Sequence, residues 1–357
     1  MNQLTQISRS IQVFLRELNG APKPKAPAPP RTLGVALGGG FARGMVHIGV
    51  LKVLVEAGIP IAAISGTSSG SIMGAGFCSG RTPAELAAIG RTLRFKDVAR
   101  WTLDRGGFCS NDRIGALLGR TCPCKGFSEL SIPLVVVATE LITGKPAIFR
   151  DGCIADAVRA SCAYPGMFTP VEINGVLHVD GMLSYEVPTT PLKEMGIDCV
   201  LGVHLQSRWS GTNEPGHFFD VIGQCFAIAQ TRMSQHWEHD ADLLLRPDVG
   251  AFAFDDFARA DEMIAIGEQS MRAALPELKQ KLGIADSAKS AQSVITVSST
   301  NNATTSAANA ISVTSVAKDA AITASAISAV TAARAAKSTA KSAKPTIGSG
   351  PAVQTPA

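Results

Sequence analysis

Short apolar runs alternate with longer stretches of helical periodicity through the middle of the chain. The runs at 33–37, 61–65, 134–139, 200–205 and 243–245 have the length and composition of buried strands. Helical patterns follow at 46–56, 154–160 and 260–275, the last of which Pro276 is expected to interrupt. Strands that alternate with helices predict a three-layer α/β/α domain with a mainly parallel central sheet.

The two ends of the chain differ from this middle part. Residues 1–20 place Leu and Ile at helical spacing and predict an amphipathic helix, which packs on the main domain or a second subunit in the favoured interpretation. The alternative is a helix lying on a membrane, with Arg9 and Arg16 at the headgroups. Residues 21–30 predict a Pro-rich linker, and 31–285 are expected to form the structured domain. Residues 286–357 are rich in Ala, Ser, Thr and Lys and predict a disordered tail.

Composition narrows the class of protein. The chain has 357 residues and a net charge of +4, too mild to indicate a nucleic-acid partner. No charge-free apolar stretch reaches the roughly 20 residues that span a bilayer, and no signal peptide is recognised at the N-terminus. We therefore expect a cytoplasmic protein, with peripheral contact at the inner membrane surface left open. Eight scattered cysteines indicate reduced thiols. Cys122 and Cys124 have no matching second pair, so we expect neither metal nor cofactor.

The segment Gly66-Thr67-Ser68-Ser69-Gly70 matches the G-x-S-x-G pattern of a nucleophile elbow. The pattern alone is weak, so its context decides. A strand-like run precedes Ser68, and the small-residue stretch 69–77 predicts a close-packed helix after it. Gly66 and Gly70 relieve crowding around a serine held in a strained turn. Ser68 is therefore the candidate nucleophile.

A second glycine-rich segment, 38–44, links the first strand to a helix. Backbone N–H groups at such a junction bind anions. A Walker A loop would end in Gly-Lys-Ser/Thr, and a dinucleotide fingerprint would need glycine in place of Phe41, so both readings fail. The segment instead suits an oxyanion hole, with N–H donors from Gly38, Gly39 and Gly40.

The strand-like run 176–179 delivers Asp180 to a turn at Gly181. Asp before Gly is often only a turn former. His178 lies on the same strand face as Asp180, so it stays an alternative catalytic group, although a locally bonded strand residue is favoured. His47 is expected to pack or cap. His236 and His239, beside Asp240, have metal-ligand spacing, but a solvated helix face is favoured.

In combination these motifs resemble those of the patatin-like phospholipases. The glycine loop ends in Arg43-Gly44, the Gly-Thr-Ser-Ser-Gly elbow follows about 25 residues later, and Asp180-Gly181 comes about 110 residues after that. Residues 159–171 and 138–141 are similar to stretches of the bacterial members. The resemblance covers about half of the chain, from 33 to 205.

The resemblance implies a mechanism without a histidine. Ser68 would attack an acyl ester or phospholipid and form an acyl-enzyme, Asp180 would be the base, the glycine loop would hold the oxyanion, and Arg43 would shape that loop. A carboxylate with a pKa near 4 is a poor base at neutral pH, so the site must raise that pKa or strongly stabilise the alkoxide. The chain departs from the family's pattern at Met182, where glycine or alanine is usual, and at Phe41, which is expected to line the acyl pocket.

Two other functions compete with a lipid acyl hydrolase. An acyl-enzyme can be discharged to an alcohol or a thiol, which would make the chain an acyltransferase or thioesterase. A regulatory protein could keep the fold without catalysis, but it would have no need of an intact Ser68, Asp180 and glycine loop. No acidic loop with calcium-ligand spacing is present.

Overall fold

The computed structural model describes residues 31–102, 104, 106–205, 218–233 and 235–284. The predicted N-terminal helix (1–20), linker (21–30) and tail (286–357) lie outside the described residues. Every described residue belongs to a compact unit that ends at Ala285.

The strands are β1 (Leu33–Leu37), β2 (Ile61–Thr67), β3 (Arg100–Trp101), β4 (Cys109–Ser110), β5 (Leu134–Glu140), β6 (Pro146–Phe149), β7 (Val171–Ile173), β8 (Val176–Asp180), β9 (Cys199–Val203) and β10 (Leu243–Leu245). The α-helices are α2 (Val46–Glu56), α3 (Ser69–Cys78), α4 (Pro83–Thr92), α5 (Asp112–Thr121), α6 (Ile154–Ser161), α7 (Thr190–Glu194), α8 (Phe218–Met233), α9 (Gln235–His239) and α10 (Ala260–Leu282). Short 3-10 helices are η1 (Phe41–Met45), η2 (Phe95–Asp97), η3 (Phe127–Glu129), η4 (Gly181–Leu183) and η5 (Phe257–Arg259).

A central sheet organises the described residues. Its strand order is β10-β9-β1-β2-β5-β8-β7, and β6 pairs with β5 beside this path. The pairs from β10 to β5 are parallel, whereas β5 pairs antiparallel with β6 and β8, and β8 with β7. Leu37 lies opposite Gly66 on one side and Val203 on the other. The carboxyl ends of β1, β2 and β9 therefore meet at one edge of the sheet, where ligands bind in open α/β sheets.

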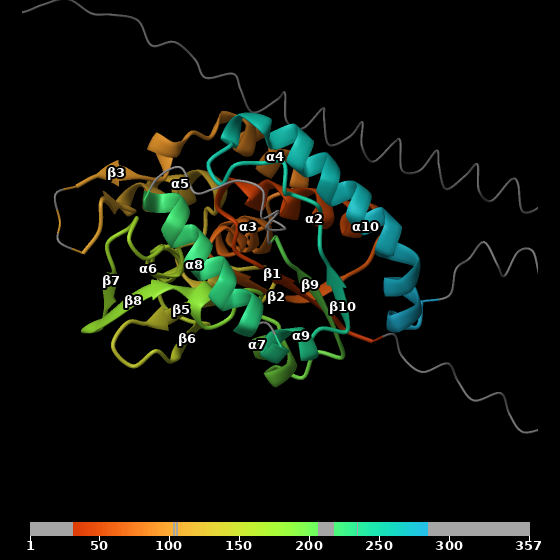
Figure 1. Cartoon of the computed structure of the whole chain (residues 1–357). Helices are drawn as coiled ribbons and strands as arrows, with labels where there is room; N and C mark the ends of the chain where they lie inside the picture. The colour runs from red at the N-terminus through yellow and green to blue at the C-terminus, as the bar shows by residue number, and fades with distance from the viewer. Residues whose placement is uncertain (1–30, 103, 105, 206–217, 234, 285–357) are drawn as a thin grey trace, which may run out of the picture. The chain divides into compact units, whose positions relative to one another are not determined.

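Helices cover both faces of this sheet, which confirms the predicted three-layer fold. Side chains of β1 alternate between the faces: Val35 and Leu37 point into the larger core, which includes α2, α3 and α10. Ala36 points the other way and packs against Leu192 of α7 and Trp237 of α9. Figure 1 shows α2 and α10 on one side of the strands and α7 and α9 on the other.

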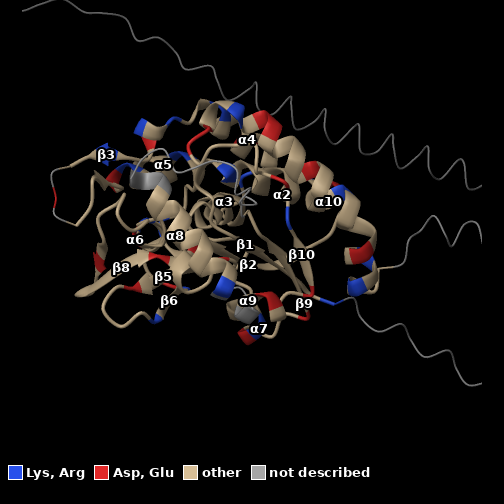
Figure 2. Ribbon diagram, viewed as in Figure 1, with Lys and Arg blue, Asp and Glu red and all other residues tan. Residues whose placement is uncertain are grey.

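The C-terminal helix α10 differs from the prediction that Pro276 would interrupt it. The helix continues through Pro276 to Leu282. A proline removes one backbone hydrogen bond, but buried side chains on both sides of it, Met271 and Leu278 among them, hold α10 against the core. Basic and acidic side chains are interspersed along its outer surface, as Figure 2 shows.

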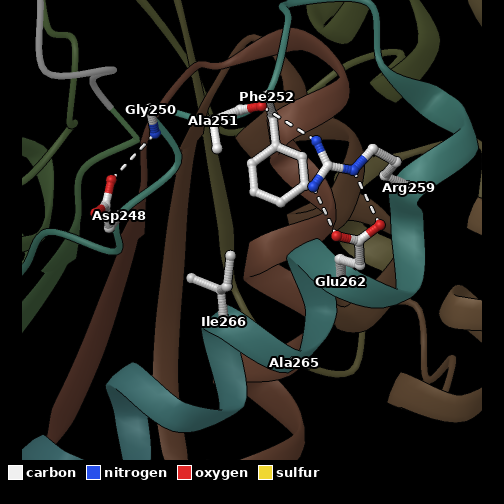
Figure 3. A pocket seen from close by; sticks show the side chains of 8 residues that line it. All are labelled: Asp248, Gly250, Ala251, Phe252, Arg259, Glu262, Ala265 and Ile266. Atoms are coloured by element: carbon white, nitrogen blue, oxygen red, sulfur yellow. Dashed lines mark hydrogen bonds and ion pairs between the residues drawn. The ribbon is translucent and has the colours of Figure 1, made fainter. Parts of the chain in front are cut away.

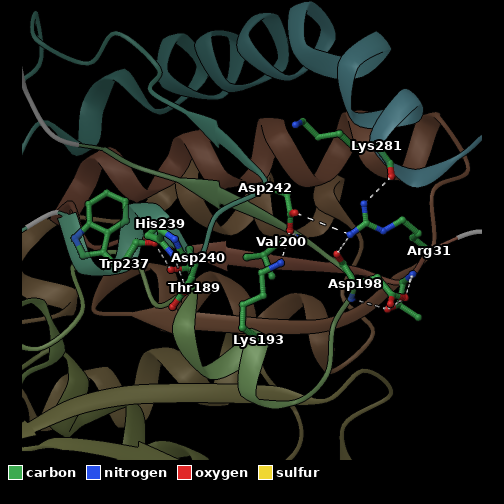
Figure 4. A network of polar contacts seen from close by, with 11 residues as sticks. Arg31, Thr189, Lys193, Asp198, Val200, Trp237, His239, Asp240, Asp242 and Lys281 are labelled. Carbon is green, nitrogen blue, oxygen red and sulfur yellow. Dashed lines mark hydrogen bonds and ion pairs between the residues drawn. The ribbon is translucent and has the colours of Figure 1, made fainter.

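A polar network fixes the amino end of the sheet (Figure 4). Asp242, just before β10, accepts a hydrogen bond from the Val200 N–H at 2.8 Å and pairs with Lys193 Nζ at 2.5 Å. Arg31 reaches the carbonyl oxygens of Asp198 and Lys281, the second at 3.3 Å. The network joins β9, β10, α7 and the end of α10, and it lies at the edge opposite the carboxyl ends of the parallel strands.

Three further features bear on the sequence analysis. All eight cysteines are free. Within the part of the chain that the structure describes, no helix has the length and apolar character needed to cross a membrane. The same residues contain no group of three or more His, Cys, Asp or Glu side chains arranged to hold a metal ion.

Candidate active site

Ser68 occupies the turn between β2 and α3. Its backbone has φ 52° and ψ −124°, a left-handed conformation that is strained for a residue with a side chain. The flanking glycines make the turn possible. A Cβ atom on Gly70 would lie 2.1 Å from the Leu37 carbonyl oxygen, and one on Gly66 would lie 2.6 Å from the Ser71 Cα. The predicted strand, glycine, serine, glycine and helix are therefore present in that order.

Ser161, at the end of α6, braces this turn. The Ser68 N–H donates to Ser161 Oγ at 2.8 Å, and the Ser161 hydroxyl donates to the Val137 carbonyl oxygen at 2.6 Å. Ser161 is completely buried, so water does not compete for these bonds. This role of Ser161 has no signal in the sequence, because nothing in its spacing from Ser68 indicates the contact.

Asp180 ends β8 and is completely buried. The antiparallel pairing of β8 with β5 sets Asp180 opposite Ala138, and a Cβ atom on Gly181 would lie 2.2 Å from the Val137 carbonyl oxygen. This close approach explains the glycine at 181. It brings the carboxylate next to β2, which also pairs with β5 and carries Ser68 at its end.

The charge state of Asp180 is set by burial. Burial raises the pKa of its carboxyl from 3.8 to about 7, while the Met182 N–H and the Ser68 side chain limit the rise. Oδ1 accepts the Met182 N–H at 3.0 Å. Oδ2 has no hydrogen bond of good geometry to any described residue, although Ser68 is near enough to favour the ionised form. The carboxylate thus has one oxygen fixed and one free beside the serine.

The glycine loop lies beside Ser68. A Cβ atom on Gly39 would lie 3.3 Å from Ser68 Cβ. Gly38 was expected to donate its N–H to an oxyanion. That N–H instead donates to the Val203 carbonyl oxygen at 3.0 Å, which continues the pairing of β1 with β9. The Gly39 N–H makes a longer bond, 3.3 Å, to the Glu186 carbonyl oxygen. The Gly40 N–H has no acceptor among the residues described and is the freest donor of the three.

Arg43 ties the glycine loop to the backbone at Phe252. Its Nε and Nη2 both donate to the Phe252 carbonyl oxygen, at 3.1 and 3.0 Å. Burial lowers the pKa of the guanidinium below its usual value. Phe41 takes a left-handed conformation with φ 54°, and its ring packs against those of Phe168 and Phe254.

A cavity of about 500 Å³ opens at Ser68 and the glycine loop. Its walls are mainly apolar, and Phe41 is among them, as predicted. Arg43 and Glu186 are the charged residues among the described side chains that line it. Helix α8 contributes Gly223, Gln224, Ala227 and Gln230 to one wall. Apolar lining residues on the main core include Ile72, Met73, Leu117, Met167, Phe168 and Phe257.

Glu186 and His204 form a buried pair that the sequence analysis missed. Glu186 Oε1 and His204 Nε2 are 2.8 Å apart, and both residues are nearly inaccessible to solvent. The rings of His204 and Trp237 pack in a T-shaped arrangement, with centroids 5.0 Å apart. The two residues are 18 positions apart, so only the return of the chain along β9 brings them together.

None of the described histidine side chains is among the residues that line the cavity. His178 is buried against Phe149, with ring centroids 5.4 Å apart. His47 is buried, and its Nε2 lies 2.8 Å from the Gly38 carbonyl oxygen. Burial lowers the pKa of His47 to about 4, so it is neutral near pH 7. His239 is exposed beside Asp240, and the side chain of His236 lies outside the described residues.

A second hollow, of about 660 Å³, lies between the 248–252 loop and α10 (Figure 3). Its charged side chains have partners: Arg259 makes two bonds to Glu262, at 2.9 and 2.6 Å, and lies over the Phe252 ring. Asp248 accepts the Gly250 N–H at 3.2 Å. Its described lining contains no serine, threonine or cysteine. The cavity at Ser68 is therefore the candidate active site.

The fold and this cavity define a three-layer α/β protein with an elbow serine beside a buried aspartate. The sequence model of the family described as patatin-like phospholipase matches residues 35–193 of this chain. The chain belongs to the patatin-like phospholipase family.

Several curated proteins are similar to this chain. An uncharacterized NTE family protein of Mycobacterium tuberculosis (strain ATCC 25618 / H37Rv) is 32% identical over 180 residues, which are 50% of each chain. Another from the same strain is 33% identical over 271 residues, 69% of this chain and 46% of the relative. Lysophospholipase NTE1 of Coccidioides immitis (strain RS) is 26% identical over 289 residues, 71% of this chain and 18% of the relative. The chain spans about half the length of the first of these relatives and less of the others.

Among solved structures, VipD from Legionella pneumophila is similar with a TM-score of 0.40 and 13% identity. The match covers 70% of this chain and 67% of VipD.

Proposed function

We propose that this chain is a lipid acyl hydrolase in which Ser68 is the nucleophile and Asp180 is the base. The observation that carries the proposal is the state of Asp180, which is completely buried beside Ser68 with one oxygen unpaired and a pKa of about 7. A base whose pKa lies near the working pH is suited to proton transfer. Lipid hydrolase activity is also what membership of the patatin-like phospholipase family supports.

The reaction then has two balanced steps. Ser68 Oγ forms a bond to the acyl carbon while its proton passes to Asp180, and the ester bond breaks as the leaving alkoxide takes that proton. Water next attacks the acyl-enzyme and gives its proton to Asp180. The fatty acid leaves as the proton returns to Ser68 Oγ. The same aspartate serves both steps, so no histidine is required.

Charge that develops on the acyl oxygen needs nearby donors. Gly40 offers the freest N–H, and Gly39 can contribute if its long bond to Glu186 opens. Helix α3 begins immediately after Ser68, so the positive end of its dipole faces the same point. Arg43 keeps the loop in place through Phe252 rather than touching the oxyanion.

A fluorophosphonate probe tests the nucleophile. The wild-type protein should be labelled and should release acid from acyl esters, and Ser68→Ala should do neither. Ser79→Ala is a matched control, because Ser79 lies just after α3, outside the cavity, and its hydroxyl donates to the Gly76 carbonyl oxygen. An unlabelled wild-type protein that cleaves no ester would exclude the proposal. Full turnover in Asp180→Asn would instead direct attention to His178.

Esters with long acyl chains reside in membranes, so we expect peripheral contact at the cytoplasmic side. Helix α8 supports this part of the proposal, since it lines the cavity and also exposes Val221 and Ile228. Sedimentation with liposomes measures the contact, and binding equal to that of a Val221→Ser, Ile228→Ser double variant would exclude this face.

A further inference from the structure

Three of the residues that line the cavity at Ser68 carry buried polar atoms without hydrogen-bond partners among the described residues. Glu186 Oε2, Gln224 Nε2 and Gln230 Nε2 are buried and make no hydrogen bond with any described residue. All three residues line the cavity, two of them from α8. A buried polar atom without a partner costs free energy, and three around one cavity indicate a polar ligand that supplies the missing bonds.

The Glu186 carboxylate is held in place. Its Oε1 bonds to His204 Nε2 at 2.8 Å, and Trp237 packs against that imidazole. Its backbone carbonyl oxygen accepts the Gly39 N–H, and Gly39 contacts Ser68. Glu186 is thus separated from the elbow serine by one residue of the glycine loop. A rigid carboxylate with one open oxygen is an acceptor for a cationic donor.

The two glutamines add neutral partners. Each primary amide offers two N–H donors and, on the other side, a carbonyl acceptor. The amides of Gln224 and Gln230 therefore suit oxygen atoms of an ester's alcohol portion, such as those of a phosphodiester. Arg43, the other charged residue of the described lining, has two of its nitrogen atoms tied to Phe252. The rest of the lining is mainly apolar and suits the acyl chain.

We propose that Glu186, Gln224 and Gln230 form the subsite for the alcohol portion of the substrate, and that Glu186 selects a primary ammonium group. The inference rests on the proposed lipid hydrolase function. A primary ammonium has N–H donors that complete the bonding of Glu186 Oε2. A trimethylammonium has the same charge but no donor, so it leaves that oxygen unpaired. The subsite thus distinguishes two headgroups of equal charge.

Two phospholipids with identical acyl chains test the selection. One has an ethanolamine and the other a choline headgroup, and both are presented in the same detergent micelles. The wild-type kcat/KM should favour the ethanolamine lipid by about tenfold or more. Glu186→Gln keeps the size of the side chain and removes its charge, so the ratio should fall close to one. Glu172→Gln, an exposed carboxylate on β7 outside the cavity lining, should keep the wild-type ratio.

A wild-type ratio near one overturns the inference. An equal fall in kcat/KM for both lipids in Glu186→Gln also overturns it, because Glu186 would then only support the glycine loop. If Glu186→Gln does not fold, Gln224→Met tests the subsite instead. Its KM should rise for both phospholipids relative to its KM for p-nitrophenyl butyrate, which has no headgroup. A ratio of phospholipid KM to p-nitrophenyl butyrate KM equal to that of the wild type refutes the inference.

Failure of the underlying function has a different signature. If Ser68 is labelled by fluorophosphonate and p-nitrophenyl butyrate is hydrolysed, but no headgroup preference is found, the subsite is refuted and the hydrolase function stands. If neither labelling nor hydrolysis is detected, the hydrolase function itself is refuted.

Discussion

Replacing Asp180 with asparagine should inactivate the protein and at the same time stabilise it. Burial raises the pKa of Asp180 from 3.8 to about 7, so the native state holds a proton that the unfolded chain releases. Between these two values the unfolded state binds fewer protons than the native state, and stability therefore falls as pH rises. Above pH 7 the native state carries a buried, ionised carboxylate at its full cost.

The magnitude follows from the two pKa values. The cost is about 1 kcal/mol at pH 4.5 and about 4 kcal/mol at pH 8, since each pKa unit corresponds to about 1.4 kcal/mol. Asparagine avoids this cost, and its Oδ1 can still accept the Met182 N–H. The free energy of unfolding of Asp180→Asn minus that of the wild type should therefore rise by about 3 kcal/mol between pH 4.5 and pH 8.

Urea unfolding of both proteins at several pH values measures this difference. Other titrating groups are common to the two proteins and cancel, as does any fixed effect of the substitution. A difference that stays constant from pH 4.5 to pH 8 would refute a raised pKa. Catalysis by Asp180 would then have to depend on stabilisation of the alkoxide alone.

Three further predictions concern the same site. The kcat/KM for a soluble acyl ester should rise about tenfold per pH unit and level off above about pH 7, because Asp180 must be ionised to act, and a flat pH–rate profile would contradict this role. Gly70→Ala should cost more than about 3 kcal/mol of stability in thermal unfolding, because its Cβ would lie 2.1 Å from a backbone oxygen. Gly115→Ala is the control: open space surrounds Gly115, so the change should be neutral or stabilising. Ser161→Ala removes the acceptor of the Ser68 N–H and should lower kcat/KM about tenfold, and unchanged kinetics would show that the elbow holds its shape without that bond.

Much of the parallel sheet could be predicted because its strands are buried on both faces. The runs at 33–37 and 243–245 match β1 and β10, and the helix 46–56 matches α2. The run at 61–65 extends to Thr67 as β2, because Gly66 pairs with β1 and Thr67 with β5 despite the turn propensity of glycine. Tertiary pairing overrode the local preference there.

The antiparallel part of the sheet and the partners of the site could not be predicted in this way. Periodicity identifies a strand but not its neighbour, so the contact of β8 with β5 that positions Asp180 has no local signal. Ser161 and Glu186 act through atoms that lie far away in sequence. Gly38 was predicted as an oxyanion donor because it lies in the glycine-rich junction between a strand and a helix. Its N–H instead donates to the Val203 carbonyl oxygen of β9. Glu186 is the charged residue of the segment between Asp180 and Lys193, and this feature could have drawn attention to it.

The position of β9 has a consequence for where this protein can be divided. The family match ends at residue 193, before β9 begins, yet β9 pairs with β1 along its whole length from Leu33 to Leu37. A fragment cut at residue 193 would leave the central strand of the parallel sheet with an open edge, which is a template for aggregation. It would also lose α10, which covers α2. The boundary of sequence resemblance and the boundary of the folding unit therefore do not coincide, and a soluble fragment of this family member has to extend through Leu282.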